Sequence, residues 1–100
     1  MANAENLNFE WHTPKAQSNL RRHGVSFDEA RTVFGDPLSI TILDIQHSTD
    51  EERQFIVGMS DANRLLMVVH SERDEAEVVR IISARLATRR ERMQYEEERI

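Results

Sequence analysis

Residues 77–91 read EVVRIISARLATRRE. The first part of this stretch is rich in β-branched side chains and predicts a strand over residues 77–86, which we expect to be central in a sheet. Thr88 to Glu91 then form a capping-box pattern, which predicts the start of a last helix that extends through about Ile100. The chain is therefore predicted to end in a strand that leads directly into a helix.

Three further strands are predicted upstream of this one. In residues 38–42, apolar side chains alternate with polar ones, which is the period of a strand with one solvated face. Residues 53–59 and 65–70 are the other two candidates, and the polar turn at residues 60–63 separates them. The short links predict antiparallel neighbours, and Phe9-Glu10-Trp11 is a candidate for a short first strand.

Two helices are predicted near the start of the chain. Thr13 as a capping hydroxyl and Pro14 at the first helical position predict a helix over residues 14–23, which ends at Gly24. A second capping box at Ser26 predicts another helix, with Phe27, Ala30 and Phe34 as its buried stripe. Helices grouped in this way predict an α+β fold, in which two N-terminal helices and one C-terminal helix pack on an antiparallel β-sheet.

Length and composition favour one soluble domain. A chain of 100 residues has the size of a single domain, which we expect to span residues 1–100 with a flexible N-terminus at 1–8. No apolar run approaches the roughly 18 residues that a membrane span needs, and the first residues do not resemble a secretion signal. The absence of cysteine excludes disulfides and thiolate metal sites, and a cytoplasmic location is predicted.

The charge is distributed unevenly along the chain. The net charge of -5 argues against affinity for phosphate backbones, because Lys and Arg supply most of that affinity. Residues 79–95, however, hold five arginines and one acid, whereas residues 44–52 hold four acids and neither Lys nor Arg. This pattern predicts a surface with separate cationic and anionic parts, of which the cationic part favours anion recognition.

Fragments spread over most of the chain resemble the BrnT toxin family. Their order and spacing, from Phe9 to Tyr95, make the set specific. The chain departs from the family pattern at His12, where Asp is usual, and in its acidic net charge, since ribonuclease toxins are usually basic. The fragments are Phe9-Glu10-Trp11, Pro14-Lys15, Asn19, His23-Gly24-Val25-Ser26-Phe27, Phe34-Gly35-Asp36-Pro37, Glu52-Arg53, Arg80-Ile81-Ile82-Ser83-Ala84-Arg85, Glu91-Arg92 and Tyr95.

The resemblance implies a RelE-like fold and an endoribonuclease that cleaves RNA and blocks translation without a metal or other cofactor. It also implies a hetero-oligomer with a BrnA-like antitoxin, whose ribbon-helix-helix part binds DNA. The complex would repress its own operon, so operator DNA would be bound only through the antitoxin. No membrane partner is expected.

Arg80 and Arg85 are the first candidates for catalysis. Cleavage of RNA needs cations that stabilise the phosphate as charge builds, and both arginines lie on the predicted central strand. Their spacing of five places them on opposite faces of a regular strand, unless a bulge or the end of the strand turns one of them round. For one of the two, an ion pair with Glu91 or another acid is an equally good interpretation.

Two other side chains are predicted to be catalytic. His70 ends a predicted strand, and an imidazole suits acid or base work near neutral pH, although a structural role at the end of the strand is the alternative. Tyr95 shares a helix face with Glu91, and in RelE-like folds a C-terminal tyrosine or acid often takes part in the site. Packing against the sheet is the alternative for Tyr95, and capping is the alternative for Glu91.

A further group is predicted to contact RNA. Lys15, Asn19 and His23 recur at steps of four on the first helix and form one polar stripe, which could equally be a solvated face. Arg53 and Arg89 complete this group, and Arg53 is ranked behind Arg80 and Arg85. The acidic loop at residues 44–52 lacks the glycine and histidine spacing of a metal site, so no metal is predicted there.

A non-catalytic module is the alternative to a nuclease. Residues 14–34 resemble a helix-turn-helix that could bind DNA, but Asp28 and Glu29 would then stand at the leading end of the recognition helix, where they would oppose phosphate. In the other version of this alternative, the arginines only clasp an acidic partner.

Overall fold

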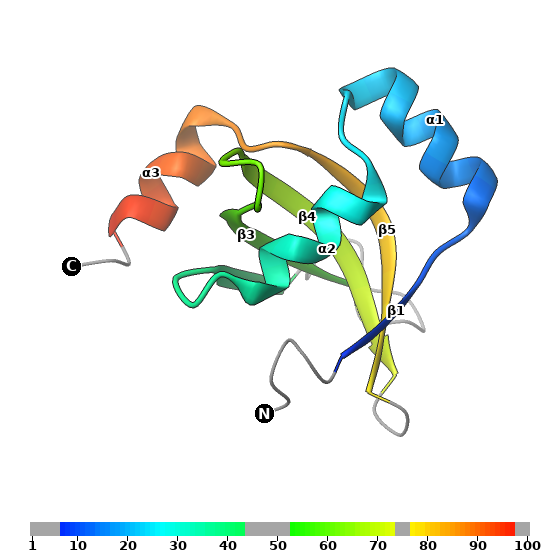
Figure 1. Ribbon diagram of the computed structural model, residues 1–100. Coiled ribbons are helices and arrows are strands. Elements are labelled where there is room, and N and C mark those ends of the chain that lie inside the picture. Colours follow the sequence, from blue (N-terminus) through cyan, green and yellow to red (C-terminus); the bar gives the residue numbers. More distant parts are fainter. Residues whose placement is uncertain (1–6, 44–52, 74–76, 98–100) are drawn as a thin grey trace.

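A five-stranded sheet with the order β1-β5-β4-β3-β2 forms the centre of the part of the chain that this computed structural model describes, residues 7–43, 53–73 and 77–97 (Figure 1). The elements in chain order are β1 (Asn8–Glu10), α1 (Thr13–His23), α2 (Phe27–Thr32), the short 3-10 helix η2 (Val33–Gly35), β2 (Ile40–Leu43), β3 (Arg53–Met59), β4 (Leu65–Arg73), β5 (Val78–Leu86) and α3 (Arg89–Glu97). The predicted α+β class is confirmed, with the same order of helices and strands.

The sheet is mostly antiparallel. Strands β2 to β5 are joined by antiparallel ladders, as predicted. β1 differs, because it pairs in parallel with the first residues of β5. β1 and β5 are far apart in the sequence, and α1 and α2 follow β1 directly, so no tight hairpin fixes its direction. β1 includes Asn8, although residues 1–8 were expected to be flexible; residues 1–6 lie outside the described part.

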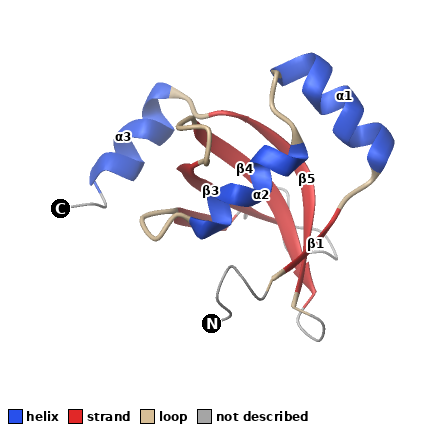
Figure 2. Ribbon diagram, viewed as in Figure 1, coloured by secondary structure: helices blue, strands red, loops and turns tan. Residues whose placement is uncertain are grey.

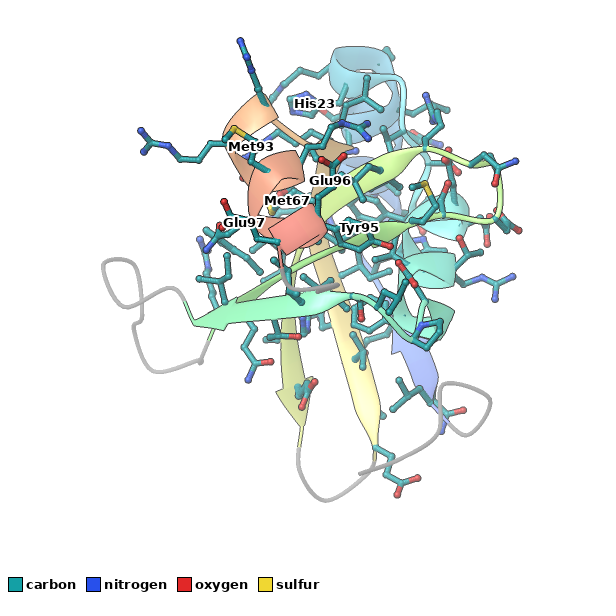
Figure 3. The ribbon with its side chains drawn as sticks, turned by 90° about the vertical axis from the view of Figure 1, so that its left-hand side faces the viewer. His23, Met67, Met93, Tyr95, Glu96 and Glu97 are labelled. Carbon is teal, nitrogen blue, oxygen red and sulfur yellow. The ribbon has the colours of Figure 1, made fainter. Side chains whose placement is uncertain are left out.

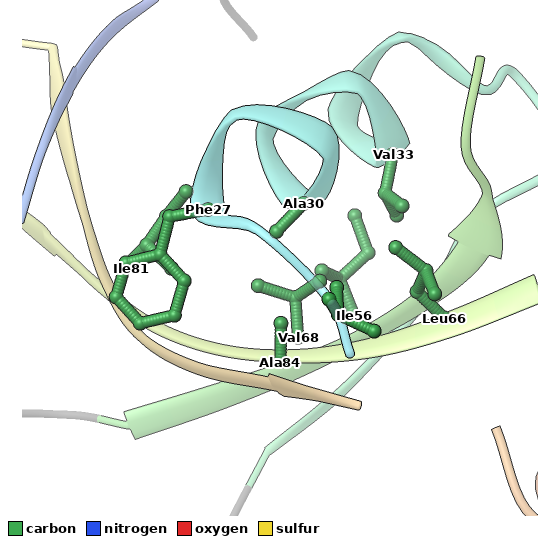
Figure 4. Close-up of a cluster of buried hydrophobic side chains, with 9 residues drawn as sticks. Phe27, Ala30, Val33, Ile56, Leu66, Val68, Ile81 and Ala84 are labelled. Atoms are coloured by element: carbon green, nitrogen blue, oxygen red, sulfur yellow. The ribbon is translucent and has the colours of Figure 1, made fainter. Parts of the chain in front are cut away.

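The two faces of the sheet are covered by different helices (Figure 2). On the α2-side face, Phe27, Ala30 and Val33 are almost fully buried against β3, β4 and β5 (Figure 4). Burial of a side chain of the size of Phe or Val contributes about 1.5–3 kcal/mol, so this cluster fixes α2 on the sheet. Its buried members are Val25, Phe27, Ala30, Val33, Ile56, Leu66, Val68, Ile81 and Ala84.

The α3-side face carries a second, smaller cluster. Tyr95 is the buried residue that α3 contributes, and it packs on apolar side chains of β3 and β4. The buried members of this cluster are Val57, Leu65, Met67, Val69 and Tyr95. Phe55 and Ile82, which pack at its margin, are only partly buried, so parts of this face remain exposed.

A β-bulge interrupts the ladder between β4 and β5. His70 lies opposite Ile81, whereas its neighbour Val69 lies opposite Ser83. One step along β4 therefore corresponds to two steps along β5, and Ile82 is the extra residue. The alternation of side chains between the two faces shifts by one residue at this point.

The predicted helix caps are only partly confirmed. Ser26 accepts a hydrogen bond from the Glu29 backbone N–H (3.0 Å), but the Glu29 carboxylate does not reach back to Ser26. It binds Arg64 and accepts a hydrogen bond from the Ser60 hydroxyl instead, which ties α2 to the β3–β4 turn. On α1 the predicted cap at Thr13 is wrong, because His12 is the N-cap and its side chain makes no capping bond.

Replacement of Gly58 by Ala is predicted to destabilise the fold. A Cβ at position 58 would lie 2.8 Å from Val33 Cγ1 and 3.0 Å from Ser39 Cβ, so η2 and the following turn would have to move off β3. We expect Gly58→Ala to lower the free energy of unfolding by about 1–3 kcal/mol in urea denaturation. Gly35→Ala is the control, since nothing lies within 4 Å of its added Cβ. Equal stability of the two variants would contradict this packing.

Candidate functional site

The bulge places Arg80 and Arg85 on the same face of the sheet. Ile81 and Ala84, three residues apart, both belong to the α2-side cluster, so the arginines that flank them point to the opposite side. Arg85 lies opposite Met67, which belongs to the α3-side cluster. Of the two exceptions that the sequence left open, a bulge or the end of the strand, this strand adopts the bulge.

A polar row crosses the α3-side face at the level of Arg80. Strand register aligns Arg53 of β3 with Ser71 of β4, Ser71 with Arg80 of β5, and Arg80 with Glu10 of β1. Neighbouring strands lie about 4.8 Å apart, so a hydroxyl and a carboxylate stand beside the two cations. Ser71 and Glu10 could not be identified as site residues from the sequence, because only the register of β4 and the parallel pairing of β1 bring them into this row.

Arg85 forms a two-point ion pair with Glu91. Its Nη1 and Nη2 donate to Glu91 Oε1 and Oε2 at 2.8 and 2.9 Å, and Nη1 also donates to the Leu86 carbonyl at 3.1 Å. The Thr88 backbone N–H donates to Glu91 Oε1 at 2.8 Å, and the Glu91 N–H donates to Thr88 Oγ1 at 3.2 Å, which completes the predicted capping box. The ion pair proposed as the alternative for one arginine is therefore present at Arg85.

The carboxyl of Glu91 is held in its charged form. Its partial burial opposes the charge, but hydrogen bonds from Arg85 and Thr88 outweigh that effect and lower the pKa of Glu91 below its usual value. Glu91 is therefore ionised at neutral pH, where it holds both the start of α3 and the guanidinium of Arg85.

The structure separates His70 from the arginines. Its side chain lies on the α2-side face, 1% exposed, with its ring edge-on to Phe34 at 4.9 Å. Neither ring nitrogen has a hydrogen-bond partner among the described residues, and burial lowers the pKa of His70 from 6.5 to about 4. A neutral, enclosed imidazole on this face does not reach a substrate on the other face, so we leave His70 out of the proposed site.

Tyr95 has an anchoring position. It is 4% exposed, on the side of α3 that faces the sheet, whereas Met93 is half exposed (Figure 3). Its hydroxyl donates a hydrogen bond to Asp36 Oδ2 at 2.7 Å, and the same oxygen accepts a bond from the Met59 backbone N–H at 2.8 Å. These contacts favour packing over catalysis for Tyr95, and we leave it out of the proposed site as well.

Asn19 docks α1 on the open edge of β5. Its Nδ2 donates to the carbonyls of Ala84 (2.8 Å) and Val25 (3.0 Å), and its Oδ1 accepts from the Ala84 N–H (3.1 Å). The amide thus pairs with Ala84 as a neighbouring strand would. Because Asn19 is 7% exposed and its polar atoms are all engaged, these contacts assign it to the fold rather than to RNA contact.

The remaining predicted RNA contacts are distributed over β3, α3 and α1. Arg53 and Arg89 are exposed, at the start of β3 and at the start of α3. Lys15 is exposed and His23 partly exposed on α1, which packs along β5. The acidic loop at 44–52 lies outside the described residues, and within the described residues no group of three or more His, Asp or Glu could hold a metal ion.

Comparison with known proteins identifies the family. The family model described as "Ribonuclease toxin, BrnT, of type II toxin-antitoxin system" matches residues 11–91. The crystal structure of the Brucella abortus ribonuclease toxin BrnT is similar, with a TM-score of 0.62, 19% sequence identity, and coverage of 83% of this chain and 99% of that chain. At this identity the likeness shows a shared fold. No curated protein sequence matches.

No helix in the described ranges is both long and apolar enough to cross a membrane. The predicted relationship to the RelE fold stays a prediction.

Replacement of Asn19 by Ala is predicted to destabilise the protein because it leaves the polar groups of Ala84 without partners. Loss of these buried hydrogen bonds should lower the free energy of unfolding by about 2–4 kcal/mol. Lys15→Ala, on the exposed side of the same helix, should change it by less than about 0.5 kcal/mol. Thermal and urea denaturation measure the difference, and an Asn19→Ala variant as stable as Lys15→Ala would contradict this role.

The burial of His70 predicts a pH dependence of stability. The pKa of His70 is about 4 in the folded protein and near 6.5 when exposed, so the unfolded chain takes up the proton first on acidification. The stabilisation is complete above pH 6.5 and is lost as the pH falls from 6.5 towards 4, by about 3 kcal/mol in all. The free energy of unfolding, measured by urea denaturation at several pH values in this range, should fall less steeply with decreasing pH for His70→Leu than for the wild-type protein. The same pH dependence in both proteins would contradict the lowered pKa of His70.

Proposed function

Because this chain belongs to the BrnT family, the ribonuclease toxins of type II toxin–antitoxin systems, we propose that it cleaves RNA on the α3-side face of its sheet. The observation that carries the proposal is the bulge in β5, which gives Arg80 and Arg85 to one face. Parts of that face are exposed, and its polar row includes Arg53, which is exposed, and Arg80, which is partly exposed.

The chemistry follows from the cations. The 2′-hydroxyl of RNA attacks the adjacent phosphate, and the bond from phosphorus to the 5′-oxygen of the next nucleotide breaks, which leaves a 2′,3′-cyclic phosphate and a free 5′-hydroxyl. The 2′-hydroxyl passes its proton to water, and water protonates the departing 5′-oxygen. Negative charge builds on the phosphate oxygens in the transition state. Arg80 and Arg85 stabilise this charge, while Arg53 and Arg89 bind neighbouring phosphates. Lys15 and His23 on α1 extend the contact along the strand of RNA. Glu10, which is aligned with Arg80 in the strand register, supplies the carboxylate of the polar row.

The biological role that we propose is the one implied by the family. RNA cleavage blocks translation, and a BrnA-like antitoxin with a ribbon-helix-helix part binds the toxin and neutralises it. The hetero-oligomer binds operator DNA through the antitoxin and represses its own operon. We place the protein in the cytoplasm and the reaction among those that need no metal ion or other cofactor.

A DNA-binding module is the weaker candidate. In a helix-turn-helix the second helix is exposed to the major groove, whereas Phe27, Ala30 and Val33 attach α2 to the sheet. Glu29 on this helix is engaged by Arg64. A module that only binds an acidic partner protein would not cleave RNA, so an RNA-cleavage assay distinguishes it from a nuclease.

Arg80→Ala and Arg85→Ala are predicted to abolish RNA cleavage. Removal of one group that stabilises the transition-state charge typically lowers kcat about 10²–10³-fold. Purified variants are assayed on single-stranded RNA in the presence of EDTA, and growth arrest is scored on overexpression. Arg31→Ala is the matched control, because this exposed arginine lies on α2 and pairs with Asp28.

Wild-type protein should cleave RNA in EDTA, and Arg31→Ala should match it. Wild-type activity and toxicity in both Arg80→Ala and Arg85→Ala, with circular dichroism showing a folded protein, would refute the site. Failure of the wild-type protein to cleave RNA would refute the nuclease itself and favour a clasp without catalysis.

A further inference from the structure

We propose that Arg85 is a preformed phosphate-binding fork and that Glu91 is the positioning residue that holds it. The ion pair therefore does not remove Arg85 from the reaction; it orients the guanidinium for RNA. This inference rests on the proposed function, because it assigns a phosphodiester of the RNA to one particular edge of Arg85.

Some of the N–H donors of Arg85 bind groups of the protein, and the others lie along an edge of the guanidinium that is open to a ligand. A guanidinium has five N–H groups in a fixed plane. Both hydrogens of Nη1 are used, one by Glu91 Oε1 and one by the Leu86 carbonyl, and one hydrogen of Nη2 is used by Glu91 Oε2. No described residue accepts a hydrogen bond from Nε–H or from the second Nη2–H of Arg85.

Those two remaining donors form the second fork of the guanidinium. Nε–H and the outer Nη2–H lie parallel along one side of the plane, with the spacing that matches two oxygens of a phosphate. The side chain of Arg85 is 34% exposed, so a ligand can approach it. The edge used by Glu91 and the remaining edge are different, and a phosphate can bind without displacing the carboxylate.

The groups that hold Arg85 are themselves fixed in place. Glu91 is itself fixed by the capping box with Thr88, and its side chain is only 19% exposed. Arg85 lies opposite buried Met67 on β4. An arginine held in this way loses little conformational freedom when it binds RNA, which is the benefit of preorganisation. RNA is favoured over other anions because Arg80 lies on the same face, which lets one strand bind both cations.

The test depends on the sign of one effect. Glu91→Gln removes a negative charge, and charge alone predicts tighter RNA binding. Positioning predicts the opposite, because glutamine has only one oxygen and cannot hold both Nη1 and Nη2. Glu96→Gln on the same helix is the matched control, since Glu96 is exposed and makes no contact with Arg85.

Binding is measured with a 2′-O-methyl RNA oligonucleotide, which lacks the attacking hydroxyl and is not cleaved. We expect Glu91→Gln to weaken binding about tenfold, the effect of one lost charge-assisted hydrogen bond, whereas Glu96→Gln leaves it equal or slightly tighter. Arg85→Ala should also lower the slope of log K against log salt by about 0.7, the contribution of one phosphate on a single strand.

The double variant separates positioning from damage to α3. If Glu91 acts through Arg85, Glu91→Gln has no further effect on binding in the Arg85→Ala background. An equal loss in both backgrounds, or tighter binding by Glu91→Gln than by Glu96→Gln, would overturn the inference while the proposed function stands. Absence of RNA binding by the wild-type protein would overturn the proposed function and this inference together.

Discussion

The arrangement of the site depends on one extra residue in β5. With Ile82 inserted opposite the step from Val69 to His70, the strand presents Ile81 and Ala84 to one face and Arg80 and Arg85 to the other. A regular strand would send one of the two arginines into the α2-side core, where a charge without a partner is costly. The bulge therefore lets β5 pack against α2 and, at the same time, places both arginines on the α3-side face.

Local patterns predicted much of the fold. The bounds of β3 are those expected from the sequence, and the capping box at Thr88 forms with both of its hydrogen bonds. The spacing of apolar residues and the residues that begin or end a helix or strand are local features, so they can be recognised from neighbouring residues. The capping box predicted at Ser26 is only partly confirmed, because the Glu29 carboxylate binds Arg64, which is distant in the sequence, instead of bonding back to Ser26.

The composition of the site was harder to predict because it depends on pairing between distant strands. Arg80 and Arg85 could be predicted from the sequence, which left a bulge or the end of the strand as ways to place both on one face. Only the ladder with β4 shows that a bulge is present and where it lies. The parallel pairing of β1, which brings Glu10 beside Arg80, has no local signal. An imidazole suits acid or base catalysis, which made His70 a candidate. Residues 65–69 before it are all apolar, so the sequence does not indicate on which face of the sheet His70 lies.

The acidic net charge is compatible with a nuclease because the charges are not spread evenly. Glu29 is neutralised by Arg64 and Glu91 by Arg85, whereas Arg53 and Arg89 are exposed on or beside the α3-side face. Phosphate responds to the local field within about 10 Å at ordinary salt rather than to the net charge of the chain.

Methyl NMR of two adjacent isoleucines tests the central claim most directly, because Ile81 and Ile82 report on opposite faces of one strand. On addition of a 2′-O-methyl RNA oligonucleotide, which cannot be cleaved, the account predicts a shift of the Ile82 methyl signals and little change at Ile81. A shift at Ile81 with Ile82 unchanged would contradict it.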